Sequence, residues 1–201
     1  MIRLILVRHA ITTCNEGGNL SGQIDSTLSE KGKLQVEQLT CYLKDENIDE
    51  IYTTPFSRTK DTMEKLAQIK SIEINETDKF NEIDFGEFDG LSFDIIKRDY
   101  PEEFEKMIKE GSEYTYPKGE SLIDTFDRVS KELENILKDK DNKTILICSH
   151  GGTIRNILSY LISKDYKYHW NFKIDNASVS VVEVENDFAV INKLNDTSFL
   201  A

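Results

Sequence analysis

Two histidines and an arginine stand where apolar segments of the chain end. Arg8 and His9 follow the β-branched, apolar residues 2–7, and His150 follows a second such run, residues 144–148. Each run is typical of a buried strand that leads through a loop into a helix. Because parallel strands bring their carboxyl ends to one edge of a sheet, we expect His9 and His150 to face one another there.

These residue types suit the chemistry of phosphate esters. The planar guanidinium groups of Arg8 and Arg58 match phosphate oxygens, and Arg58 stands at the start of a predicted helix, where backbone N–H groups also favour an anion. A neutral His9 can act as a nucleophile toward phosphorus. Glu82, in the loop after the third predicted strand, is the best-placed carboxyl group to protonate the leaving alcohol. Gly151, directly after His150, allows a close approach of the backbone to a ligand.

Each of these residues also has an ordinary structural explanation when it is taken alone. Arg8 is compatible with a surface charge, His150 with a helix cap or a core position, and Glu82 with a solvated loop acid. Cys148 is compatible with packing inside a strand. The hypothesis of a site therefore depends on the joint occurrence of these residues, in order, at the same kind of strand-to-helix junction.

Motifs of several other phosphate-handling proteins are absent. The chain contains neither G-x-x-x-x-G-K-[S/T] nor G-x-G-x-x-G. None of its three cysteines is followed six positions later by an arginine, the spacing that cysteine-dependent phosphatases use. The three histidines show no H-x-x-x-H or H-E-x-x-H spacing, so we expect no metal site and no cofactor.

Length and composition fit a single domain over residues 1–201. Hydrophobic residues make up 38% and charged residues 31%, and the net charge is −12. This negative charge disfavours nucleic acid and anionic membranes as partners, but not a small phosphate ester held by local arginines. Three scattered cysteines and no recognisable signal peptide lead us to expect a cytoplasmic location. The sequence does not decide between a monomer and a homodimer.

The hydrophobic patterns predict an alternation of strands and helices. This alternation predicts a three-layer α/β/α sandwich with a mostly parallel central sheet and an antiparallel edge hairpin. Ser29 and Ser57 are expected N-caps, and residues 81–121 are expected to form a lid-like insertion near the ligand. Leu34, Leu39 and Leu43 are expected on the inward face of the first helix. Strands are predicted at residues 2–7, 49–52, 71–75, 144–148, 178–185 and 188–194, and helices at 29–46, from 57 onward, 101–111, 120–138 and 152–163.

The chain resembles the histidine phosphatase superfamily, which includes cofactor-dependent phosphoglycerate mutases. Six segments carry the resemblance in order, from V-R-H-A-I-T-T-C-N near the start to S-H-G-G before the last helix. They span residues 7–15, 21–32, 52–62, 81–90, 117–121 and 149–152. The sequence departs from the family pattern at Ala10, Ile11, Phe88 and Lys118, where glycine, an acidic residue, tryptophan and glycine are usual.

The resemblance implies a role for each candidate residue. Arg8, Arg58 and His150 would bind the phosphate, His9 would be phosphorylated and Glu82 would donate the proton. The resemblance further implies contacts with the substrate from Asn15, Ser21 and Gly22, and we expect the backbone at Gly151 to contact the substrate as well.

We therefore expect a metal-independent phosphomonoesterase that acts through a phosphohistidine, with His150 protonated. The alternatives are a phosphoglycerate mutase-type transferase and a non-catalytic module that binds a phosphorylated ligand. Residues 169–175 resemble α-ribazole phosphatases of cobalamin synthesis, so α-ribazole 5'-phosphate is one expected substrate. A sugar phosphate or a phosphoglycerate is the other.

Overall fold

A six-stranded sheet forms the centre of the protein, whose computed structural model describes all 201 residues. The sheet order is β3-β2-β4-β1-β5-β6. Strands β3, β2, β4 and β1 are parallel to one another, whereas β5 and β6 form an antiparallel hairpin beside β1. The strands are β1 (Ile2–Arg8), β2 (Glu50–Thr53), β3 (Ile74–Glu76), β4 (Thr144–Ser149), β5 (Val179–Glu185) and β6 (Phe188–Asp196). The predicted mostly parallel sheet with an antiparallel edge hairpin is confirmed.

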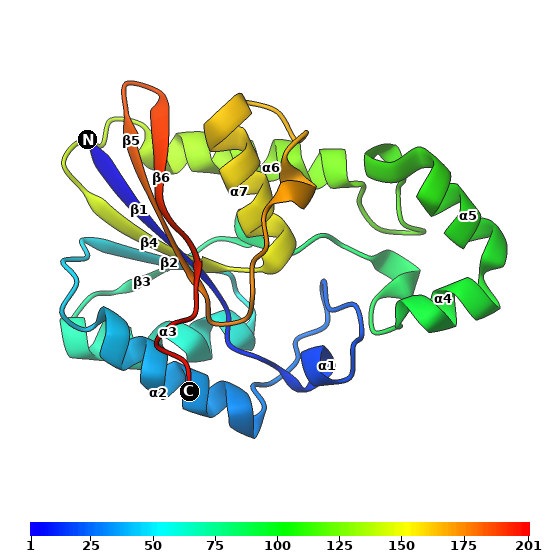
Figure 1. Cartoon of the computed structure of the whole chain (residues 1–201), viewed down its shortest axis with the longest axis horizontal. Coiled ribbons are helices and arrows are strands. Elements are labelled where there is room, and N and C mark those ends of the chain that lie inside the picture. The colour runs from blue at the N-terminus through cyan, green and yellow to red at the C-terminus, as the bar shows by residue number, and fades with distance from the viewer.

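Helices cover both faces of this sheet. Figure 1 shows α2 and α3 on one side of the strands and α6 and α7 on the other, so the predicted three layers are also confirmed. None of the helices has the length and apolar composition that a membrane span requires. The helices are α1 (Thr13–Glu16), α2 (Glu30–Leu43), α3 (Ser57–Lys70), α4 (Phe93–Asp99), α5 (Pro101–Glu110), α6 (Leu122–Leu137) and α7 (Gly151–Ser163).

The alternation of side chains along β1 explains why both faces are covered. Leu4 and Leu6 are buried in a cluster with residues of α6 and α7. Ile5 and Val7 point to the opposite face and are buried in a second cluster with residues of α2 and α3. A strand that is apolar on both faces must be central, because successive side chains point to opposite sides of a sheet.

Helices α4 and α5 form an arm that projects from the sheet layers (Figure 1). The arm has a small core of its own, in which Phe88, Ile96 and Tyr114 are buried. Pro101 occupies the first turn of α5, and Gly111 ends this helix with a φ of +58°. Both residues act as the sequence predicted, because proline lacks an N–H group that the first turn would leave unpaired and glycine tolerates a positive φ.

Several local predictions were wrong. Ser57 does not cap α3: it is the first residue of the helix, and its N–H and hydroxyl both donate to Asp25. Leu34 is 66% exposed, although Leu39 and Leu43 on the same helix are buried. The short helices α1 and α4 were not predicted, because four and seven residues are too few to show a helical period.

Candidate active site

The register of the two central strands brings the histidines together. Strands β1 and β4 are parallel, with Arg8 opposite Ser149, and the N–H of His9 donates to the carbonyl oxygen of Ser149 over 2.9 Å. The residue that directly follows each strand is a histidine: His9 follows β1 and His150 follows β4. The ring centroids of His9 and His150 lie 5.2 Å apart, with an angle of 63° between the ring planes.

One nitrogen of His9 is committed to the backbone. Nδ1 lies 2.8 Å from the carbonyl oxygen of Ala10, which can only accept a hydrogen bond, so Nδ1 carries the proton. The lone pair then resides on Nε2. His9 is buried, and this burial lowers its pKa well below the usual value, with Arg8 and Arg58 lowering it further. A neutral imidazole with a free Nε2 is the nucleophilic form of this side chain.

Arg58 is held by three of its N–H groups. Its Nη1 and Nη2 donate to the carbonyl oxygens of Ile24 and Gly22, both over 2.7 Å, and its Nε donates to Nδ1 of His150 over 3.2 Å. The guanidinium carbon also lies 4.3 Å from the centroid of the Phe56 ring. Burial lowers the pKa of this fully buried arginine, but a guanidinium remains charged at any working pH. Arg58 is thus a fixed cation beside the two histidines.

His150 occupies the N-cap position of α7 without capping it. Because its Nδ1 accepts from Arg58, that atom is unprotonated, while Nε2 lies 3.1 Å from Oγ1 of Thr54. Burial lowers the pKa of His150 well below its usual value, and Arg58 adds to this effect. We expected a protonated His150, but this arrangement holds a neutral ring. The correction follows from the hydrogen bond to an arginine, which the sequence did not reveal.

Arg8 has an unused donor in the buried interior. Its Nη1 donates to the carbonyl oxygen of Ile174 over 2.8 Å, but its buried Nε has no hydrogen-bond partner. Gly151 packs against the guanidinium: a Cβ atom there would lie 3.4 Å from the Cζ atom of Arg8, an ordinary contact. The absence of a side chain is therefore not needed for space at Gly151. An unpaired buried N–H of a cation is a ready donor to an anion.

Glu82 lies against the first turn of α7. Its Oε2 accepts from the N–H of Gly152 over 2.9 Å, and its Oε1 accepts from the N–H of Ile83 over 3.1 Å. A Cβ atom on residue 152 would lie only 2.5 Å from Oε1 of Glu82. The second glycine of the Gly151-Gly152 pair is therefore the one that makes room for a functional group. The first turn of α7 therefore fixes the position of this carboxyl group.

The remaining predicted residues line or support the site to different extents. Oδ1 of Asn15, on α1, accepts from Nδ2 of Asn176 over 3.1 Å. The hydroxyl of Ser21 lies 3.4 Å from the carbonyl oxygen of Ile24, at the edge of hydrogen bonding. The N–H of Gly22 donates to Asp89 over 2.7 Å and its carbonyl accepts from Arg58, so both backbone groups have partners within the protein.

Three supporting residues escaped the sequence analysis. Asp89 accepts from three successive backbone N–H groups, those of residues 22, 23 and 24, and so shapes the loop that holds Arg58. Thr54 contacts His150, and Asn176 bonds both Asn15 and the carbonyl oxygen of His9. No local pattern marks these residues, because the partners named here are 65 or more positions away in the sequence.

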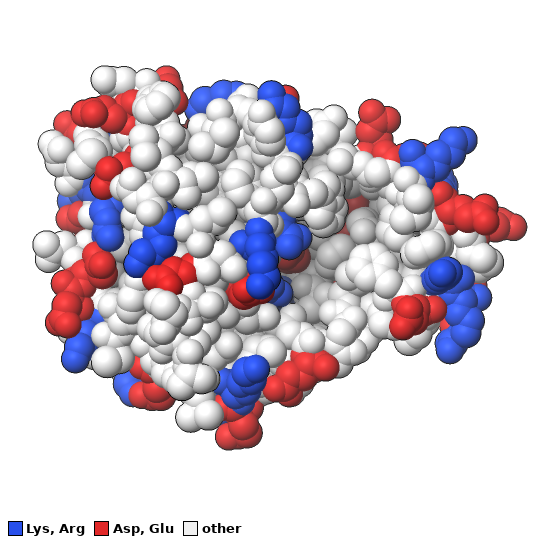
Figure 2. All heavy atoms as spheres, viewed as in Figure 1, with Lys and Arg blue, Asp and Glu red and all other residues white.

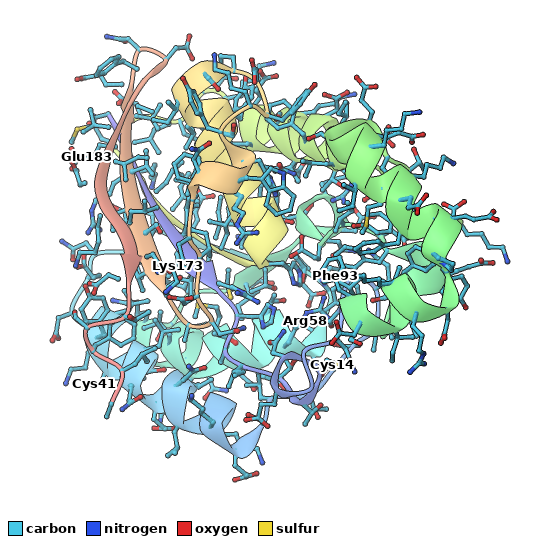
Figure 3. The ribbon with its side chains drawn as sticks, turned by 45° about the vertical axis from the view of Figure 1, so that its right-hand side comes forward. Cys14, Cys41, Arg58, Phe93, Lys173 and Glu183 are labelled. Carbon is cyan, nitrogen blue, oxygen red and sulfur yellow. The ribbon has the colours of Figure 1, made fainter.

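A cavity of about 250 Å³ opens beside Glu82 and Gly152. Phe93 of α4 and Met107 of α5 line its other side, together with Tyr116 from the segment that follows the arm. In Figure 3, Arg58 of α3 and Phe93 of α4 approach this region from different elements. Figure 2 shows the surface hollowed between the main body and the arm, with charged side chains at the edge of the hollow. That residues 81–121 form a lid over a ligand stays a prediction.

The positive charge at the site comes from arginines. No group of three or more histidine, cysteine, aspartate or glutamate side chains in the protein is arranged to hold a metal ion. Cys148 is buried in β4, and burial raises the pKa of its thiol, as expected for a packing residue. A buried imidazole, fixed guanidinium groups and a carboxylate at a cavity wall are together suited to transfer of a phosphoryl group.

Comparisons with known proteins give the family. The family model of the histidine phosphatase superfamily (branch 1) matches residues 4–197. Phosphoserine phosphatase 1 of Hydrogenobacter thermophilus is 37% identical over 200 residues, which cover 100% of this chain and 95% of that protein. The α-ribazole phosphatase of Shigella flexneri has the same fold, with a TM-score of 0.91 at 23% identity over 96% of each chain.

A further solved structure resembles the chain over its whole length. It is the phosphoserine phosphatase of Entamoeba histolytica in complex with 3-phosphoglyceric acid, with a TM-score of 0.86, 25% identity and coverage of 100% of both chains. The family model, the full-length relative and the shared fold agree with one another. The chain therefore belongs to branch 1 of the histidine phosphatase superfamily and is a phosphatase of that family.

Proposed function

We propose that the protein hydrolyses a small phosphate monoester through a phosphohistidine on His9. Nε2 of His9 attacks phosphorus in line with the ester oxygen, the N–P bond forms and the P–O ester bond breaks. A protonated Glu82 delivers its proton to the leaving alcohol. Glu82 then takes a proton from water, whose oxygen attacks phosphorus, the N–P bond breaks and inorganic phosphate is released.

The arginines and His150 stabilise the transferring group. Arg8 offers its unpaired Nε, and Arg58 has N–H groups left beyond the three that bind the protein. Donors fixed in position before the reaction stabilise charge on the equatorial oxygens without reorganisation. Neutral His150 carries its proton on Nε2, because Nδ1 accepts from Arg58, and this N–H group can also donate to a phosphate oxygen.

The observation that carries this proposal is the hydrogen bond between Nδ1 of His9 and the carbonyl oxygen of Ala10. This bond aims the lone pair of Nε2 away from the backbone, in a site with two arginines. A histidine that served only to bind phosphate would donate a proton, whereas this ring is kept neutral. The bond therefore supports a nucleophile rather than a non-catalytic binding module.

Replacement of His9 by alanine tests the proposal. The His9→Ala variant should fold, as judged by circular dichroism, but should lose turnover of p-nitrophenyl phosphate by at least about 1000-fold. Wild-type protein quenched within milliseconds should carry phosphate that is labile to acid and stable to base, as a phosphoramidate is. A folded variant with nearly unchanged rates would overturn the covalent mechanism.

Two classes of substrate fit this chemistry. One consists of phosphorylated hydroxy acids, such as phosphoserine or phosphoglycerate, and is supported by the relative from Hydrogenobacter thermophilus. The other is a larger phosphorylated alcohol, such as α-ribazole 5'-phosphate. The similarity to the Shigella flexneri enzyme shows a shared fold only. The choice depends on the cavity that receives the leaving alcohol.

A further inference from the structure

Beyond Glu82, the wall of the cavity contains three polar residues that the proposed reaction does not use. They are Arg155 and Asn156 on α7 and His169 in the 3-10 helix His169–Asn171. Asn156 is fully buried, yet its Nδ2 has no hydrogen-bond partner. A buried amide group without a partner destabilises a fold, so such a group in a cavity wall indicates a ligand.

His169 sets the orientation of this amide. Its Nδ1 lies 2.7 Å from Oδ1 of Asn156, and its ring is buried. Burial lowers the pKa of His169 to about 3, with Arg155 contributing, so the ring is neutral and has one N–H group. When Nδ1 donates this proton to Oδ1 of Asn156, the Nδ2 group is left as a free donor. His169 is thus a positioning residue for Asn156.

Arg155 is a cation without an acidic partner. Its Nε donates to the carbonyl oxygen of Phe172 over 3.0 Å, and its guanidinium carbon lies 5.5 Å from the centroid of the Trp170 ring. No carboxylate of the chain forms a salt bridge with it, in contrast to Arg128, which is paired with Glu120. The Nη groups of Arg155 remain available for an anion.

The helical spacing sets the distance from Arg155 and Asn156 to the reacting atoms beside Glu82. Gly152 contacts Glu82, and Arg155 and Asn156 follow Gly152 by three and four positions on the same face of α7. One helical turn advances about 5 Å. A ligand whose ester oxygen meets Glu82 therefore reaches Arg155 and Asn156 with a group only two or three bonds further along.

We infer that Arg155 and Asn156 form a second anion subsite, which binds a carboxylate of the leaving alcohol. The inference rests on the proposed function, because Glu82 must mark the ester oxygen. The fitting substrates are phosphate monoesters of small hydroxy acids or hydroxy amino acids. The cavity of about 250 Å³ agrees with a small leaving group, since pockets for larger ligands usually measure roughly 300–1,000 Å³.

A matched pair of substrates isolates the carboxylate. 3-Phosphoglycerate and glycerol 3-phosphate share one skeleton and differ in a carboxylate against a hydroxymethyl group. Arg155→Gln should lower kcat/KM for 3-phosphoglycerate by about 10- to 100-fold, mainly through KM, the effect expected for hydrogen bonds to a charged group. Its kcat/KM for glycerol 3-phosphate should change by less than about 3-fold. Arg155→Lys should recover part of the loss.

Arg98→Gln is the control for the change in net charge, because Arg98 is exposed on the arm and paired with Asp99. Both substrates should be unaffected in this variant. Asn156→Asp keeps the shape of the side chain but places an anion in the subsite. It should raise KM for 3-phosphoglycerate selectively, provided that its melting temperature shows a folded protein. If it does not fold, the two Arg155 variants alone decide the question.

Two results would overturn the subsite. One is an equal loss on both substrates in Arg155→Gln, and the other is a wild-type preference for glycerol 3-phosphate. Both differ from failure of the proposed function, which His9→Ala measures independently. An inactive His9→Ala together with an unchanged substrate ratio in Arg155→Gln would leave the phosphatase mechanism in place and remove only the subsite.

Discussion

The Nε atom of Arg58 donates a hydrogen bond to Nδ1 of His150 over 3.2 Å. This contact joins the start of α3 to the end of β4 and fixes two phosphate-binding candidates with respect to each other. It also determines the state of the ring, because an atom that accepts from a guanidinium carries no proton. The site therefore has permanent positive charge on its arginines and a neutral pair of histidines.

Arg58→Lys should remove this arrangement while it keeps the charge. A lysine ammonium cannot donate in the planar directions that reach Gly22, Ile24 and His150. We expect kcat/KM for p-nitrophenyl phosphate to fall by about 100- to 1,000-fold, the cost of losing one preorganised donor. Steady-state kinetics on folded protein measure the effect, with Arg98→Lys as the exposed control. A loss below about 3-fold would show that charge alone matters.

Glu82→Gln should separate substrates by their leaving groups. An aryl oxide leaves without much help from an acid, but an alkoxide needs a proton. We therefore expect a much larger loss of kcat for alkyl phosphates than for p-nitrophenyl phosphate. Comparison of the two classes in one variant is the measurement. Equal losses would indicate that another acid of the same region, such as Asp84, Glu87 or Glu120, protonates the leaving group.

Gly152→Ala should give a milder form of the same effect. The new Cβ atom would lie 2.5 Å from Oε1 of Glu82, so the carboxylate must move. We expect a selective loss on alkyl phosphates of roughly 10-fold, a small part of the contribution of a general acid. Gly17→Ala is the matched control, because its Cβ would come no closer than 3.4 Å to any neighbouring atom. An unchanged alkyl-to-aryl ratio in Gly152→Ala would mean that Glu82 does not act on the leaving group.

Activity should survive prolonged incubation with a chelator. The proposed transition state receives its positive charge from Arg8 and Arg58, so no divalent cation is required. Vanadate, which can adopt a five-coordinate geometry at His9, should inhibit. Assays before and after dialysis against EDTA give the measurement. Loss of activity that Mg²⁺ or Zn²⁺ restores would contradict the mechanism.

Stability should fall as the pH drops from 7 to 5. His9, His150 and His169 are buried, and the pKa of each lies below its usual value. Below about pH 6.5 the unfolded chain takes up protons at these residues that the folded protein does not bind, so acid favours unfolding. Each histidine contributes at most about 1.4 kcal/mol per pH unit to this slope.

Urea unfolding at several pH values between 5 and 7 measures the slope. The pKa values of the paired carboxyl groups, such as that of Asp175, are lowered, mainly by Lys173 in this case, so their effect lies below this range. His169→Gln should reduce the slope of the unfolding free energy against pH by about the contribution of one histidine. A free energy of unfolding that is constant between pH 5 and 7 would show that the buried rings are protonated in the folded protein as well.

The sequence predicted the elements whose pattern is local. The apolar runs at β1 and β4 show that these strands are buried, and such strands must lie at the centre of a sheet. Their order along the chain requires crossover helices, which leads to an α/β sandwich. The meeting of His9 and His150 could also be predicted, because parallel neighbouring strands end at one edge. Short helices such as α4 could not, because they contain too few residues to show a period.

Only the tertiary structure decided the states and neighbours of the site residues. The neutral ring of His150 depends on Arg58, which is 92 positions away in sequence. The fit of Gly152 against Glu82, and the unpaired amide of Asn156 in the cavity wall, depend on how α7 packs against the loop at residue 82 and against the arm. The sequence alone determined which residue types could handle a phosphate and at which strand ends they stand. Their protonation and the space for the leaving group arise from contacts between distant segments, and no local pattern encodes such contacts.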